Sequence, residues 1–152
     1  MKKIILFFCV LVLCFSFFSC APQPSSYDML SDFMLTYGID GVIYTPNLSE
    51  WEDGYITDEL FGKIYIYEGR VPENYALFLN SYADYGSECA VFVCKDVEER
   101  EDIIEMCEER ISLFGKGDKA FIVCADNIIF YSTLSDKVRA EEVWRKIIRE
   151  HT

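Results

Sequence analysis

The second half of the chain repeats one order of elements: two short apolar runs and then an amphipathic stretch. In chain order these segments are residues 74–80, 88–94, 96–114, 120–125, 128–132 and 135–148. Short apolar runs bounded by turn residues favour strands, whereas an apolar period near 3.6 favours helices. Because each helix must cover its apolar side, the order β-β-α-β-β-α predicts an α+β fold, a two-layer sandwich of sheet and helices.

Residues at the expected ends of these elements indicate the same boundaries. Asp96 and Glu99 have capping-box spacing, and Gly115 is suited to end that helix. Residues 126–127 (Asp-Asn) suit a tight hairpin, and Ser135 is expected to cap the last helix. The positions expected to face the core are Val97, Ile103, Ile104, Cys107, Ile111, Phe114, Val138, Trp144, Ile147 and Ile148.

A helix is also predicted before these elements. Residues 26–37 carry apolar side chains at helical spacing, with Ser25 or Ser26 available as a cap and Gly38 available as a stop. An irregular, aromatic-rich segment follows this helix.

Within that segment, Gly, Pro and Asn predict an irregular connection over residues 39–56, with one short strand at 42–44. Thr57, followed by two acidic residues, is a suitable helix start, but residues 60–67 fit either a helix or a strand.

The first nineteen residues have the composition of a cleaved export signal. Lys2 and Lys3 precede sixteen uncharged residues, Ile4–Ser19. A permanent transmembrane helix usually needs about 20 apolar residues, so a signal peptide over 1–19 is the favoured interpretation.

The end of this segment resembles the lipobox of bacterial lipoproteins, in which the cysteine is lipidated and becomes the new N-terminus. Cys20 occupies that position, although Phe17 and Phe18 differ from the residues usually found there. Ordinary cleavage after Ala21 is the alternative, and it would leave Pro22 at the new N-terminus.

Lipidation of Cys20, with acyl chains such as palmitate, predicts a protein anchored to the cell membrane on its extracytoplasmic side. Residues 20–25 would then be a polar tether, and residues 26–150 a single α+β domain.

Charge excludes several classes of function. The chain has a formal net charge of −12, which becomes −14 without Lys2 and Lys3, because no acidic residue leaves with the signal. Nucleic-acid binding needs basic residues, so no nucleic-acid partner is expected. His151 is the single histidine and lies at the C-terminus, which disfavours mechanisms that need a positioned imidazole. No motif for a cofactor or metal is present, and none is predicted.

Four cysteines follow Cys20 in the chain: Cys89, Cys94, Cys107 and Cys124. Their spacing matches no short zinc motif, and no histidine lies near to activate a thiolate. The last three fall on expected core positions. Buried free thiols and one disulfide both remain open.

Two surfaces are candidates for recognition. Residues 96–110 contain eight acidic residues, which predict a solvated helix face more readily than a metal or acid–base site. The aromatic residues Tyr44, Trp51, Tyr55, Tyr65 and Tyr67 are the preferred candidate binding surface, since amphipathic rings are favoured at interfaces. Acidic neighbours on both sides of Trp51 predict that it is exposed.

Residues 88–111 and 119–147 together resemble a family of uncharacterised clostridial-type lipoproteins known only as a domain of unknown function. Lys95-Asp96 and the Asp126-Asn127 hairpin lie at corresponding places. The resemblance implies the envelope of a Gram-positive anaerobe as the habitat, and it supplies no activity or catalytic residues.

These patterns predict an acidic, lipid-anchored interaction module of the cell envelope, with an envelope protein or glycan as partner. The alternative is a cell-envelope enzyme that uses carboxylates and tyrosines on wall material.

Overall fold

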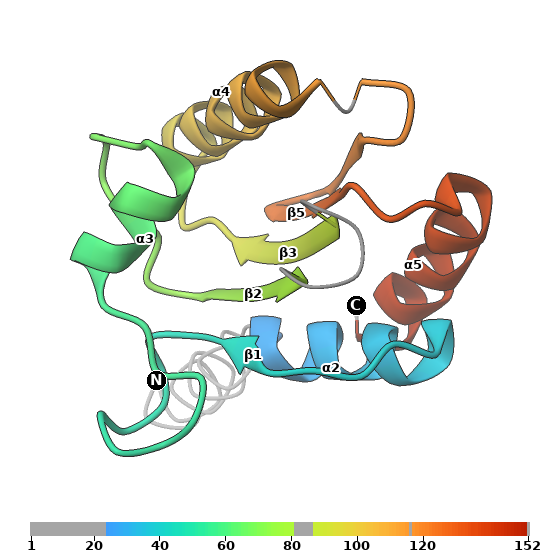
Figure 1. Ribbon diagram of the computed structural model, residues 1–152, viewed down its shortest axis with the longest axis horizontal. Coiled ribbons are helices and arrows are strands. Elements are labelled where there is room, and N and C mark those ends of the chain that lie inside the picture. Colours follow the sequence, from blue (N-terminus) through green and yellow to red (C-terminus); the bar gives the residue numbers. More distant parts are fainter. Residues whose placement is uncertain (1–23, 81–86, 116, 152) are drawn as a thin grey trace, which may run out of the picture.

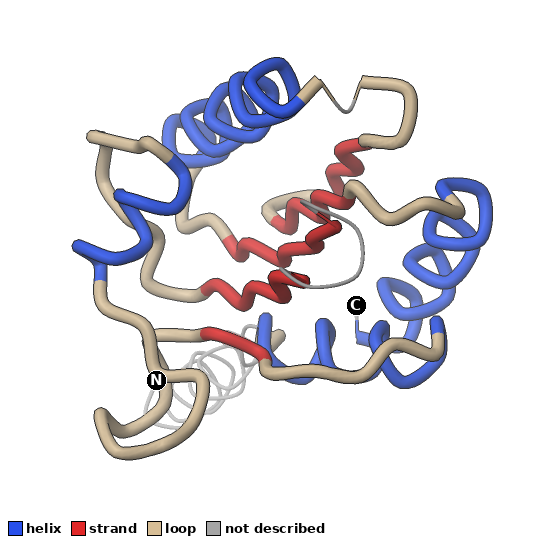
Figure 2. The backbone as a smooth tube through the Cα atoms, viewed as in Figure 1, coloured by secondary structure: helices blue, strands red, loops and turns tan. Residues whose placement is uncertain are grey.

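The computed structural model describes residues 24–80, 87–115 and 117–151 (Figures 1 and 2). In chain order its elements are α2 (Ser26–Tyr37), β1 (Ile43–Tyr44), α3 (Asp58–Tyr65), β2 (Tyr75–Asn80), β3 (Ser87–Val93), α4 (Val97–Phe114), β4 (Phe121–Ala125), β5 (Ile128–Ser132) and α5 (Lys137–His151). The predicted signal peptide and Cys20 lie outside the described residues. No helix in the described ranges is both long and apolar enough to cross a membrane.

The five strands form one antiparallel sheet with the order β1-β2-β3-β5-β4. The predicted strand pairs are confirmed as β2–β3 and β4–β5, and β3 pairs with β5 to join them. The expected hairpin is also present, with Ala125 opposite Ile128 and Asp126 at a φ of 52°. This is the α+β fold that the order of elements predicts.

The prediction of two layers is wrong, because helices cover both faces of the sheet (Figure 1). Successive side chains of a strand point to opposite faces, and every residue of β3 is buried. Val91 packs in a cluster with α2 and α5, whereas Phe92 packs in a second cluster with α3 and α4. The molecule therefore has three layers and a core on each side of the sheet.

Most helix starts lie where the sequence places them. Ser25, Thr57 and Asp96 each accept a hydrogen bond from a backbone N–H in the first turn of the helix that follows. The ambiguous stretch after Thr57 is the helix α3. Asp136, not Ser135, caps α5, because its Oδ1 accepts from the backbone N–H of Arg139 at 3.0 Å.

Three of the ten predicted core positions are wrong. Val97, Phe114 and Val138 are 58%, 53% and 69% exposed. All three lie in the terminal turns of α4 or α5, where a side chain has neighbours on one side only. Met106 and Arg110 are buried in α4 instead.

Candidate functional site

Residues 45–55 form a closed surface loop, here called the Trp51 loop. Its ends meet at a parallel bridge between Thr45 and Tyr55, and Thr45 donates its backbone N–H to the carbonyl of Gly54 at 2.9 Å. Gly54 has a φ of +96°, and a Cβ there would lie 2.2 Å from the carbonyl oxygen of Ile43. The loop therefore covers the outer edge of β1, and it has the compact form of an Ω-loop.

The tip of the Trp51 loop is held by hydrogen bonds between Ser49 and Glu52. Ser49 donates its backbone N–H to Oε2 of Glu52 at 2.8 Å, and Glu52 donates its own backbone N–H to the carbonyl of Ser49 at 2.9 Å. The hydrogen bonds from Ser49 lower the pKa of Glu52 below its ordinary value of 4.5. Trp51 lies between these two residues and is 91% exposed, as its acidic neighbours predict.

A groove of about 370 Å³ lies beside this loop, between α2 and residues 39–43. Asp40 and Asp53 contribute carboxylates to its lining, and Asp53 belongs to the Trp51 loop. No sequence pattern considered above predicts this groove. The signal that could have found it is Leu35, an apolar residue outside the buried stripe of α2 and 81% exposed.

The other predicted aromatic residues are less exposed than Trp51. Tyr65 is only 3% exposed and lies in the cluster between the sheet, α3 and α4, so its assignment to the binding surface is wrong. Tyr44 and Tyr67 are partly buried against that same cluster. Tyr55 is partly buried at the base of the Trp51 loop. Of the five candidates, Trp51 alone is fully available to a partner.

Tyr65 packs inward against Phe61 and Phe92, beside a buried ionic network. Glu88 of β3 accepts two hydrogen bonds of 2.6 Å from the guanidinium of Arg110, and a third of 2.6 Å from the hydroxyl of Tyr131. Arg110 also donates to the carbonyl of Ile64 and lies over the Tyr65 ring, 4.5 Å from its centroid. This network was missed, although Glu88 is the one charged residue in the apolar run 88–94.

Both carboxylate oxygens of Glu88 accept hydrogen bonds within this network. The side chains of Arg110 and Glu88 are 9% and 5% exposed, and burial together with the charge of Glu88 raises the pKa of Tyr131. Burial likewise raises the pKa of Tyr65 well above its ordinary value of 10.0. The network joins α4 and the end of α3 to the sheet.

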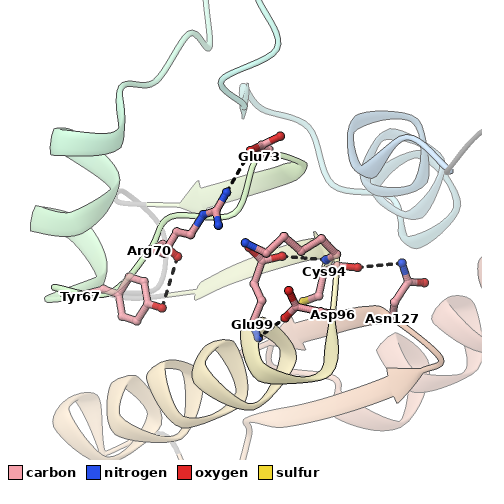
Figure 3. A network of polar contacts seen from close by, with 8 residues as sticks. Tyr67, Arg70, Glu73, Cys94, Asp96, Glu99 and Asn127 are labelled. Carbon is pink, nitrogen blue, oxygen red and sulfur yellow. Dashed lines mark hydrogen bonds and ion pairs between the residues drawn. The ribbon is translucent and has the colours of Figure 1, made fainter.

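The start of α4 gathers charged residues around a cleft of about 190 Å³ (Figure 3). Glu99 accepts from the backbone N–H of Lys95 at 2.7 Å, and Asp96 accepts from that of Glu99 at 2.8 Å. These two carboxylates therefore cap the helix, as their spacing predicts. Within residues 24–80, 87–115 and 117–151, no three His, Cys, Asp or Glu side chains are grouped to hold a metal ion.

Four cysteines are free thiols: Cys89, Cys94, Cys107 and Cys124. Cys89, Cys94 and Cys107 are buried, and burial raises the pKa of Cys94 to about 12 and those of Cys89 and Cys107 further. Cys124 is exposed, so its expected core position is wrong: it lies on the edge strand β4. A thiol with a raised pKa is a poor nucleophile at neutral pH.

Comparison of the chain with protein-family models, with curated proteins and with solved structures finds no match.

Proposed function

We propose that the protein is a non-catalytic binding module of the bacterial cell envelope, anchored to the membrane through lipid on Cys20, and that the Trp51 loop is its recognition element. The observation that carries the proposal is the exposure of Trp51, at 91%, on a loop closed by backbone hydrogen bonds. An envelope protein is the partner that we favour over a glycan.

The energetics of the loop support recognition. Burying a large apolar side chain against a partner contributes roughly 1.5–3 kcal/mol, and Trp is enriched among residues that dominate interfaces. Because Ser49, Glu52 and Gly54 already hold the loop in one conformation, little ordering entropy is lost on binding.

The chemistry of the described residues gives less support to the alternative, an envelope enzyme that uses carboxylates and tyrosines. Glu88 and Tyr131 do lie together, at 2.6 Å, but Arg110 occupies the rest of the carboxylate and all three side chains are buried. His151 contacts Asp32 at 2.9 Å on the surface, away from this pair in the fold. A catalytic carboxylate would need access to substrate, which Glu88 lacks.

Anchoring would hold the domain close to the membrane. Asn74 donates to the carbonyl of Pro24 at 3.2 Å and accepts from the backbone N–H of Ser26 at 3.2 Å, which fixes the chain to β2 at this point. Pro24 follows Cys20 by four residues, a fully extended reach of about 14 Å. A partner of the anchored protein would therefore be a component that lies near the membrane surface.

Photo-crosslinking in intact cells tests the proposal. A photoreactive amino acid replaces Trp51 in the full chain, and in the matched control it replaces Leu113, which is 63% exposed on α4. We expect a discrete adduct from position 51 and none from position 113. Equal labelling from both positions, or none from position 51, would contradict the assigned surface.

A separate experiment addresses the anchor. Cys20→Ala should release the protein from the membrane fraction, and intact mass of the wild-type protein should show acylation of Cys20. An unmodified chain that begins at Pro22 would overturn the anchoring without bearing on the Trp51 loop.

A further inference from the structure

Among the described residues, no counter-ion pairs with the two aspartates of the groove beside α2. Neither Asp40 nor Asp53 forms an ion pair with any side chain among the described residues, and both are exposed. They line one groove although they are thirteen positions apart in the chain. The groove thus presents two negative charges that the domain itself does not neutralise.

The groove is open, and its lining combines polar atoms with apolar side chains. Leu35, Val42 and Tyr27 line it and are 81%, 45% and 38% exposed. Such exposure shows that the groove does not enclose its contents, unlike sites for small molecules, which bury most of the ligand surface. A polypeptide segment that lays alternate side chains on an open groove fits this form better.

We infer that the groove binds a basic, partly apolar segment of a partner polypeptide. A Lys or Arg side chain of that segment lies beside Asp40 and Asp53, and a neighbouring apolar side chain covers Leu35 and Val42. The inference rests on the proposed function and names the chemistry of its partner. Trp51 lies two residues before Asp53, so the same segment can reach the indole.

The negative charges of Asp40 and Asp53 disfavour an anionic glycan or a membrane surface in the groove. An anionic glycan would be repelled by the two carboxylates, and a membrane surface would have to desolvate them without a counter-ion. A basic segment instead neutralises them, and the net charge, −14 without Lys2 and Lys3, attracts it over longer distances.

Fluorescence anisotropy with a defined probe tests the inference. The probe is a dye-labelled peptide of about twelve residues that alternates Lys and Leu, with a Glu–Leu peptide as the charge-inverted control. Asp40→Asn combined with Asp53→Asn is compared with Asp102→Asn combined with Glu105→Gln, a matched pair on the exposed side of α4. Leu35→Ala is compared with Leu113→Ala, since both leucines are exposed on helices.

We expect the groove variants to raise the Kd of the Lys–Leu peptide by about three- to tenfold, and the α4 variants to change it by less than about twofold. The Glu–Leu peptide should not bind. Equal losses for both acidic pairs would show attraction by net charge alone and would overturn the inference, as would unchanged binding by the groove variants.

The failure of this inference can be told from failure of the proposed function. Crosslinking at position 51 that survives Asp40→Asn with Asp53→Asn would keep the Trp51 loop as the recognition element and reject the groove. Binding of the full domain to neutral phosphatidylcholine vesicles, lost in Leu35→Ala, would identify a lipid surface as the occupant and overturn the polypeptide.

Discussion

Removing the guanidinium of Arg110 should destabilise the domain more than any other single change to a charged side chain that we consider. The substitution Arg110→Met keeps much of the apolar stem but deletes both 2.6 Å hydrogen bonds to Glu88 and the bond to the carbonyl of Ile64. Glu88, with a side chain 5% exposed, would keep only the hydroxyl of Tyr131 as partner. An uncompensated buried charge of this kind costs about 3–5 kcal/mol.

That loss is a large part of the free energy of unfolding of the domain. Domains of this size unfold with about 5–15 kcal/mol, so a loss of about 3–5 kcal/mol is roughly a fifth or more of the stability. The exposed pair Lys63–Glu59, with side chains 69% and 78% exposed, is the matched control. Lys63→Met should cost no more than about 1 kcal/mol, because solvent already screens that pair.

Urea denaturation followed by tryptophan fluorescence measures both variants. Trp144 is fully buried and stacked on Phe130 at 4.4 Å, whereas Trp51 is exposed before and after unfolding, so the signal reports Trp144. Combining Glu88→Gln with Arg110→Met should cost less than Arg110→Met alone, since no net charge remains buried. A loss below about 1 kcal/mol for Arg110→Met, or strict additivity in the double variant, would refute the buried-pair reasoning.

Three further predictions concern the loop and the thiols. Gly54→Ala should lower the free energy of unfolding by about 1–3 kcal/mol, because the φ of Gly54 is +96° and a Cβ there would meet the carbonyl of Ile43. In the same urea titration, Gly117→Ala should leave the free energy of unfolding unchanged, because open space surrounds Gly117. The pKa of Glu52 is lowered in the folded protein, so its contribution to the stability of the loop is present above the ordinary pKa of 4.5 and is lost as the pH falls through the lowered pKa. Over that pH range, the NMR chemical shift of the Ser49 amide should move toward its value in Glu52→Gln. A chemical shift that does not change with pH would contradict this. Site-resolved thiol labelling of the folded domain should modify Cys124 first and leave Cys89 and Cys107 unmodified until unfolding; early labelling of either buried thiol would show that the packing is wrong.

Features set by neighbours in sequence could be predicted. The cap at Asp96 and the hairpin at Asp126 depend on residues within four positions, and both are confirmed. The exposure of Trp51 follows from the charges beside it, and it too is confirmed.

Features set by distant residues could not be predicted. Tyr65 is buried partly by distant residues: Phe92 contacts its ring edge-on at 6.1 Å, and Arg110, 45 positions later, lies over the ring. The third layer was missed for a similar reason. Consecutive apolar residues in β3 face both ways, but only the path of the chain shows that α3 and α4 take one face while α2 and α5 take the other.

Trp51 lies outside the residues that pack the core of this fold. The two core clusters include Ile43 and Tyr44 before the Trp51 loop and Ile56 after it, but no side chain from 46–55. The loop keeps its shape through backbone hydrogen bonds and Gly54, which do not depend on the indole. Replacing Trp51 therefore removes contact area without removing core packing, and this separation makes its side chain a direct test of binding.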